Sequence, residues 1–193
     1  MKAFGLIEEK PGVGAYLTDI GKLIFENDPY IENPFTLWIM HSNIVRNIET
    51  ATTWSIFFNR CEIDSLDKEQ LENVLFREVS KYASGVTFSE KSLSSDVDVL
   101  LSMYSKNKSK SDPEDKSTSP FATLGLLKNT DGKITKSQPD KRLLSENNIL
   151  YELSILLNDR TSISIEDVIN GDFGLSKIYN ITNVTANELL DKL

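Results

Sequence analysis

Trp38 and His41 form the first group of side chains in this sequence that could do chemistry. They are three positions apart, so they share one face of a helix, and the imidazole could act as a general base or a metal ligand. His41 is the only histidine, which excludes a site built from several histidines. A lone histidine without a visible catalytic partner favours a structural role. We expect its ring N–H to bond a backbone carbonyl while Trp38 fills the core.

Asp96 and Asp98 form the second candidate group, because carboxylate oxygens bind the Mg²⁺ or Mn²⁺ that a nuclease requires. Residues two apart on a helix do not share a face, so both could bind one ion only at a helix start or in an extended segment. Ser94, Ser95 and Asp96 are typical of a helix start, where a carboxylate favours the positive end of the helix dipole. We favour this capping interpretation, and we expect no resident cofactor.

Other catalytic motifs are absent from the sequence. The stretch 12–14 is too short for a phosphate-binding loop, and no nucleophile elbow with glycine on both sides of a serine is present. Cys61 is the only cysteine, which excludes an internal disulfide and a cysteine-based metal site. Arg60 beside it could lower the pKa of the thiol, although an inert, part-buried thiol is the commoner outcome. The sequence therefore favours a non-catalytic protein.

The charge of the chain limits any contact with nucleic acid to local regions. The net charge is −8 and the pI is about 4.8, so the whole surface does not attract DNA. Between Ser105 and Arg142, however, nine basic side chains exceed five acidic ones, whereas the remaining residues carry 12 basic and 24 acidic ones. The candidate nucleic-acid contacts are Lys10, Tyr16, Lys106, Lys108 and Lys110.

The first 25 residues must position Lys10 and Tyr16. Residues 3–9 and 15–17 have the composition of short strands around a turn, and Thr18 can cap a following helix. This order is typical of the wing of a winged-helix unit, although a plain hairpin before a helix is the alternative. The recognition helix of such a unit would precede residue 1. We therefore expect a chain truncated at its N-terminus, with uncovered apolar surface on Phe4, Leu6, Leu17 and Ile20.

The remaining sequence predicts a mainly α protein with short β-hairpins. Helical periodicity covers residues 35–48, 66–83, 89–103, 145–157, 164–169 and 185–193. Asp131 and Gly132 predict a second hairpin. Ser65 is expected to cap the helix predicted for residues 66–83. Residues 105–120 contain no side chain able to build a core, which predicts a mobile linker. We expect a wing hairpin plus helical core in 1–104 and a C-terminal hairpin and helical module in 121–193, with the C-terminus also truncated.

Neither a signal peptide nor an apolar stretch of membrane-spanning length is visible, so a cytoplasmic location without membrane contact is expected.

Several segments, taken together and in order, resemble one bacterial family. They are Phe4–Ile7, Leu17–Phe25, Asn27–Glu32, Thr36–His41, Trp54, Phe57–Asn59, Asp96–Asp98, Met103–Tyr104, Ser119–Pro120 and Leu124–Leu127. The stretch from Asn27–Glu32 to Thr36–His41 is the specific part. The family is catalogued as domain of unknown function four-thousand-and-seven. Its full-length members look longer at both ends and carry a preceding helix-turn-helix-like segment that this chain lacks.

The resemblance implies an indirect function. Such proteins look like companions of sulfur-transfer enzymes resembling phosphoadenylyl-sulfate reductases, in bacterial DNA phosphorothioation and phage-defence operons. The resemblance favours a non-catalytic component that contacts DNA mainly in complex with protein partners. One alternative is a metal-dependent DNA-nicking enzyme that uses Asp96, Asp98 or His41 with Mg²⁺ or Mn²⁺. The other is a protein-interaction scaffold whose acidic surface docks a basic sulfur-transfer enzyme.

Overall fold

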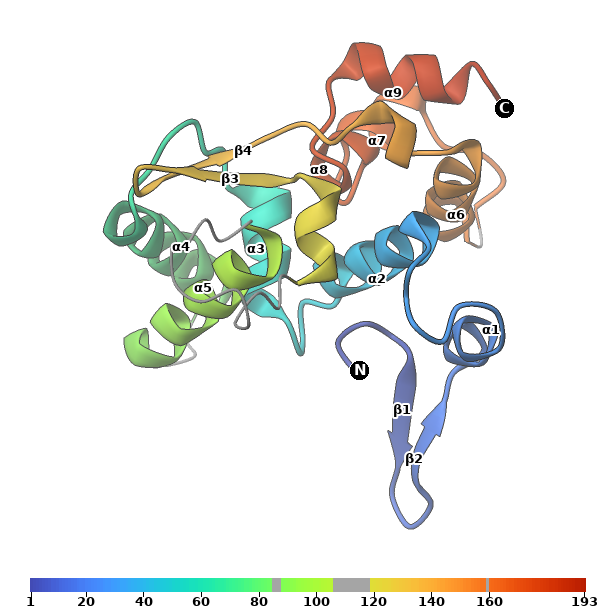
Figure 1. Cartoon of the computed structure of the whole chain (residues 1–193), viewed down its shortest axis with the longest axis horizontal. Helices are drawn as coiled ribbons and strands as arrows, with labels where there is room; N and C mark the ends of the chain where they lie inside the picture. The colour runs from blue at the N-terminus through green and yellow to red at the C-terminus, as the bar shows by residue number, and fades with distance from the viewer. Residues whose placement is uncertain (85–87, 106–118, 159) are drawn as a thin grey trace, which may run out of the picture.

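The computed structural model describes residues 1–84, 88–105, 119–158 and 160–193. This part of the chain is mainly helical with two short antiparallel hairpins, which confirms the predicted fold class (Figure 1). Most of the predicted linker 105–120 lies outside the described residues, and so do Lys106, Lys108 and Lys110. Within the described ranges, no helix has both the length and the apolar character to cross a bilayer.

The N-terminal unit consists of β1 (Ile7–Lys10), β2 (Gly14–Leu17) and α1 (Asp19–Asn27). The two strands pair antiparallel, and their tip points away from the rest of the protein (Figure 1). Thr18 caps α1 as predicted, because its hydroxyl oxygen accepts from the Gly21 N–H at 3.0 Å. The same hydroxyl donates to the Gly5 carbonyl at 2.7 Å, so one side chain fixes the start of the helix against the hairpin.

The apolar side chains predicted to be uncovered in this unit are largely covered, so that prediction is wrong. Those side chains are Phe4, Leu6, Leu17 and Ile20. Leu6 is 2% exposed within the main core, and the Phe4 ring stacks on Phe121 at 5.4 Å between centroids. The reason is that this unit packs on the body of the protein through its inner side. Leu23 and Phe25 of α1 are exposed instead.

The central helices α2 (Pro34–Arg46) and α3 (Thr52–Arg60) form the middle of the core. Asn33 caps α2, and Pro34 occupies its first turn, where a missing N–H costs nothing. Both helices are buried on most sides, as expected for helices packed between two layers. Trp38 is fully buried, and its indole N–H donates to the carbonyl of Leu143 at 2.8 Å.

The antiparallel neighbours α4 (Lys68–Tyr82) and α5 (Glu90–Tyr104) cover one side of α3. The predicted apolar stripe of α4 is buried at Leu71, Leu75 and Val79. Its cap, however, is Asp67 and not Ser65. Asp67 accepts from the Gln70 N–H at 2.9 Å, while the Gln70 side chain accepts from the Asp67 N–H at 3.0 Å. This reciprocal capping box sets the start two residues later than predicted.

The C-terminal part begins with η2 (Pro120–Leu124) and the hairpin of β3 (Leu127–Thr130) and β4 (Lys133–Lys136). The predicted turn is present, because Asp131 and Gly132 have φ angles of 52° and 79°. The remaining elements are η3 (Lys141–Leu143), α6 (Glu146–Leu157), α7 (Ile165–Asn170), α8 (Leu175–Ile178) and α9 (Asn183–Leu190). One apolar cluster includes side chains from both predicted segments, 1–104 and 121–193.

Gly21 marks the place where α1 lies against the backbone of its own unit. A Cβ atom there would lie 2.1 Å from the Leu6 carbonyl oxygen, which belongs to backbone and cannot move aside. We expect Gly21→Ala to destabilise the protein by about 1–3 kcal/mol, although alanine favours helices. Urea denaturation measures this. Lys22→Ala on the same helix serves as the control and should change stability by less than about 0.5 kcal/mol. Equal stability of both variants would contradict the close approach.

Candidate functional site

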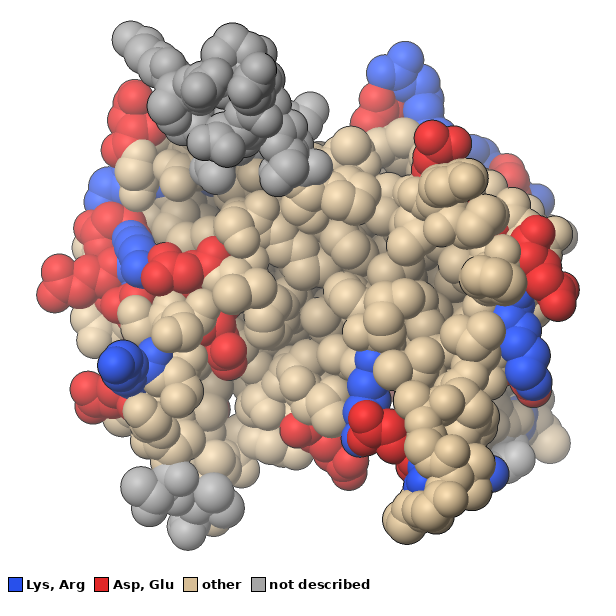
Figure 2. All heavy atoms as spheres, turned by 60° about the horizontal axis from the view of Figure 1, so that its bottom comes forward, with Lys and Arg blue, Asp and Glu red and all other residues tan. Residues whose placement is uncertain are grey.

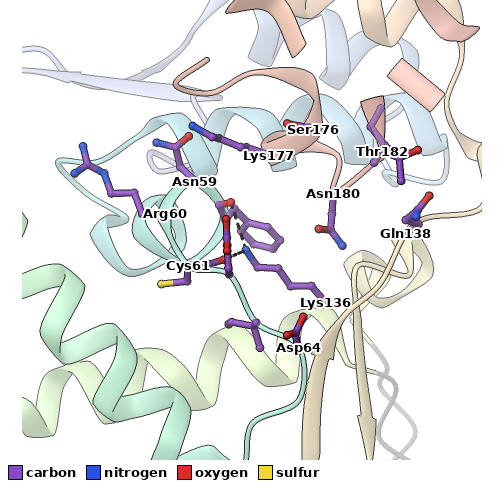
Figure 3. Close-up of a pocket in the computed structure, with 14 residues that line it drawn as sticks. Asn59, Arg60, Cys61, Asp64, Lys136, Gln138, Ser176, Lys177, Asn180 and Thr182 are labelled. Carbon is purple, nitrogen blue, oxygen red and sulfur yellow. Dashed lines mark hydrogen bonds between the residues drawn. The ribbon is translucent and has the colours of Figure 1, made fainter. Parts of the chain in front are cut away.

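A polar pocket of about 550 Å³ is a candidate site among the described residues (Figure 3). Its walls come from the end of α3 and the residues after it, from the end of β4, and from α8 with the residues that follow. Elements far apart in the sequence therefore meet here. Asn59, Gln138 and Asn180 contribute carboxamide groups, while Arg60 and Lys177 add cations. Such a volume is typical of a ligand site.

Lys136 reaches from β4 toward the end of α3 (Figure 3). Its ammonium donates to the carbonyl oxygens of Phe57 at 2.7 Å and Cys61 at 2.6 Å, with Phe58 at 3.4 Å. The last carbonyls of a helix have no partner within that helix, so this lysine supplies the missing donors. Burial lowers the pKa of Lys136 to about 8, and the nearby acidic groups of Cys61 and Glu62 oppose this shift only in part. Lys136 is thus a buried cap rather than a free nucleophile.

Cys61 is buried beside this lysine. Burial raises the pKa of its thiol to about 11, and the nearby charge of Lys136 opposes the rise only in part. The alternative in which Arg60 lowers this pKa does not apply, because burial has the largest effect and the Arg60 guanidinium lies over the Tyr82 ring at 5.7 Å. A thiol with a raised pKa carries little thiolate and reacts slowly, so Cys61 fits the inert interpretation.

The carboxamides fix the shape of the pocket by joining its walls. Asn59 accepts from the Phe173 N–H at 2.9 Å, and Asn180 donates to the Ser137 carbonyl at 2.8 Å. Asn180 and Phe173 both have positive φ angles, of 50° and 57°, in the loops next to α8. The charges that line the pocket include both signs, with Arg60 and Lys177 near Glu62 and Asp64. The pocket therefore suits a polar ligand with donors and acceptors more than a strongly charged one.

His41 is fully buried and does not line this pocket. Its Nε2 lies 2.7 Å from the Ile178 carbonyl and its Nδ1 lies 2.7 Å from the Tyr104 hydroxyl. A carbonyl can only accept, so Nε2 carries the proton and the Tyr104 hydroxyl donates to Nδ1. Burial lowers the pKa of His41 to about 4, which keeps the imidazole neutral. The side chain has the predicted structural role, with Trp38 packed edge-on at 5.6 Å.

A buried ion pair that no sequence motif predicted joins α2 to α6. Arg46 pairs with Glu152, whose side chain is 0% exposed. Tyr179 donates to the same carboxylate at 3.1 Å, and Arg46 also donates to the Phe173 carbonyl at 3.0 Å. The signal was present, because Glu152 lies three residues after the buried Ile149 and so shares the inner face of its helix.

Asp96 and Asp98 do not form a shared site. The helix starts at Glu90, so Asp96 lies inside α5, and the predicted capping role is wrong. Asp96 accepts from the Thr53 hydroxyl at 2.7 Å, whereas Asp98 pairs with Lys68 at 2.6 Å. Within the described ranges, no group of three or more His, Cys, Asp or Glu side chains is arranged to hold a metal ion.

Lys10 and Tyr16 lie together near the tip of the first hairpin. The Lys10 ammonium lies 4.8 Å from the centre of the Tyr16 ring, and the Tyr16 hydroxyl donates to Glu8. Residues Glu8 and Tyr16 are directly paired across the two strands, which explains this contact. The hairpin thus presents one exposed cation on an aromatic ring. The structure brings these two predicted residues together on the hairpin of β1 and β2, which lies apart from β4 and α8 in Figure 1.

The fold and the pocket define a mainly helical domain with a projecting hairpin and a polar pocket between distant segments. The chain belongs to the family described as "Protein of unknown function (DUF4007)", whose model matches residues 1–193, in agreement with the resemblance. Two solved structures have a similar fold. "Magnesium ion-bound SspB crystal structure" aligns with a TM-score of 0.86 and 21% identity, and "SspB crystal structure" with 0.85 and 22%.

These alignments cover 99% of this chain and 62% of each SspB chain. The chain therefore spans less than two thirds of the length of either SspB structure. No curated protein matches the sequence. At 21–22% sequence identity, the similarity to these two structures establishes a shared fold and nothing further.

The buried His41 predicts a loss of stability in acid. Its pKa in the folded protein, about 4, lies below its ordinary value of 6.5, so the unfolded chain binds the proton first. The stabilising contribution is complete above pH 6.5 and declines as the pH falls toward 4. We expect the unfolding free energy of the wild type to fall more steeply over this range than that of His41→Gln. Urea denaturation at several pH values measures both slopes. Parallel slopes would show that His41 does not titrate this way.

The role of Lys136 predicts a second effect of pH. Lys136→Met leaves buried carbonyls without a donor and should cost about 1–3 kcal/mol near pH 7, measured by denaturation. The folded pKa of about 8 lies below the ordinary 10.5, so deprotonation relieves the cost of the buried charge between these values. Relative to Lys136→Met, the wild type should therefore gain stability as the pH rises from 8 to 10.5.

The matched control is Lys133→Met, on the same strand. Its ammonium pairs with Asp67 at the surface, so stability should change little and without this pH dependence. If Lys136→Met is as stable as the wild type, the capping role of Lys136 is refuted.

Proposed function

We propose that this protein is a non-catalytic, DNA-associated component of a bacterial DNA phosphorothioation or phage-defence complex. Its membership of the family over residues 1–193 supports the proposal. Members of that family resemble companions of sulfur-transfer enzymes in such operons. The similarity of fold to SspB agrees with a common architecture. The protein would hold a reductase-like sulfur-transfer enzyme near its DNA substrate.

The structural observation that carries the DNA contact is the projecting hairpin of β1 and β2 (Figure 1). A narrow, protruding hairpin can lie along a DNA backbone, where lysine and tyrosine contact phosphates and position a protein without reading its sequence. Lys10 and Tyr16 are the side chains that we assign to this contact. The interpretation of β1, β2 and α1 as the end of a winged-helix unit is part of the same proposal.

The distribution of charge makes this contact local. In Figure 2 the charged side chains gather near the edge of the visible face, and its centre is almost free of them. Acidic and basic groups alternate along that edge, so the described residues on this face do not form a continuous basic surface. With a net charge of −8, long-range attraction of DNA is weak. We therefore propose that stable binding requires a protein partner.

The nicking alternative would need a convergent metal site. Asp96 and Asp98 each have a separate protein partner, and His41 is fully buried and does not line the polar pocket. These contacts favour assigning the three residues to structural roles. The scaffold alternative differs from the leading proposal only in lacking the DNA contact.

Gel-shift titration of the full-length gene product with duplex DNA, alone and with its operon partners, tests the proposal. Lys10→Ala should weaken binding about equally for all DNA sequences. The slope of the logarithm of the binding constant against the logarithm of the salt concentration should become shallower by about one unit for the phosphate contact that is lost. Tyr16→Ala should also weaken binding. Lys128→Ala, in the exposed part of the second hairpin, is the matched control and should bind as the wild type does. No binding at low salt under any of these conditions would refute the DNA contact.

A further inference from the structure

A second pocket, of about 520 Å³, lies where α3 and α5 begin and α4 ends. It shares no lining residue with the polar pocket. Its walls are mainly apolar, with Val79 and Leu93 buried at the sides and Ile48 half-buried. The rings of Tyr82 and Phe88 add aromatic surface. The proposed DNA contact does not use this pocket, although the hydrogen bond between Thr53 and Asp96 described above lies in its wall.

The charged side chains that line the pocket have one sign, although the Arg60 guanidinium lies beside its Tyr82 ring. Glu49 and Asp96 are the charged residues among those that line it, and both are acidic. Asp96 is half-buried, and the Thr53 hydroxyl donates to its Oδ2 at 2.7 Å. That hydrogen bond orients the carboxylate, which has lone pairs for further donors. The pocket therefore combines apolar walls with an oriented carboxylate and a second one at the surface.

Tyr82 adds a surface that favours planar cations. Its side chain is 44% exposed, and its ring already lies 5.7 Å from the guanidinium carbon of Arg60. The C-terminal end of α4 is next to it, and the negative end of a helix dipole favours a cation. A guanidinium fits this setting better than an ammonium does, because it is planar, weakly hydrated and able to bind a carboxylate through two parallel hydrogen bonds.

We infer that this pocket binds an arginine side chain of a protein partner. The methylene groups would lie against Val79 and Leu93, while the guanidinium would meet Asp96, Glu49 and the Tyr82 ring. The volume exceeds that of one side chain, so residues flanking the arginine would enter as well. A phosphate group is repelled by the two carboxylates, so nucleic acid is not the occupant. The inference goes beyond the proposed function and does not depend on DNA binding.

Nuclear magnetic resonance titration of the isotope-labelled full chain with N-acetyl-argininamide tests the inference. We expect saturable shift changes at residues that line the pocket. N-acetyl-norleucinamide, which has an apolar chain without charge, should bind at least about tenfold more weakly, because it lacks the charged hydrogen bonds. N-acetyl-lysinamide should lie between the two.

Two substitutions identify the carboxylates. Asp96→Asn retains an acceptor for Thr53 but removes the charge, and Glu49→Gln changes an exposed side chain that the fold does not need. Each should weaken argininamide binding by about tenfold. The matched controls are Asp98→Asn, on the same helix but outside the lining, and Glu62→Gln, in the other pocket. Both should bind as the wild type does.

The results that would overturn the inference are specific. Shift changes that do not saturate would show that the pocket is not a site for arginine. Norleucinamide binding as tightly as argininamide would assign the pocket to an apolar ligand. Shift changes at the same residues on adding a short DNA duplex would replace the protein partner with nucleic acid. If Asp96→Asn fails to fold, Glu49→Gln still decides the outcome.

Discussion

The packing of this protein depends on one neutral imidazole. His41 lies on α2, accepts from Tyr104 at the end of α5, and donates to Ile178 at the end of α8. Because all three groups are buried, each hydrogen bond lost there would leave a polar atom without a partner. Helices from distant parts of the chain are therefore fixed relative to one another. Phe58 packs on the His41 ring at 4.7 Å and also lines the polar pocket, so the shape of the pocket follows from this contact.

Two further sets of ionisable side chains have a similar role. Lys136 joins β4 to the end of α3, and the pair of Arg46 and Glu152 joins α2 to α6. Each of these charges is compensated by a protein partner, as a buried charge requires. They are used to hold segments together, which agrees with the proposal of a protein that positions other molecules.

Local patterns predicted most of the longer helices and both hairpins, because periodicity, Thr18 and Asp131 with Gly132 act within a few residues, but they did not predict the short helix α8. Ser65 was a plausible cap, but the reciprocal bonds of Asp67 decide the position. Leu6 belongs to an apolar cluster that includes residues far along the chain, which no local pattern contains. Neither pocket was predicted, since each is lined from separate helices and loops. The inward position of Lys136 could have been predicted, because alternation on a strand places it on the same side as the buried Ile134.

The close contact between Gly21 and the Leu6 carbonyl has a geometric consequence for the whole protein. Leu6 belongs to the main core, so the hairpin beside it is oriented by the body rather than by a flexible joint. In Figure 1 the hairpin tip and the α4–α5 pair lie on different sides of the protein. A molecule held at the tip and another held between α3, α4 and α5 would stay at a constant separation. The domain would then act as a molecular spacer, whose length is set by core packing.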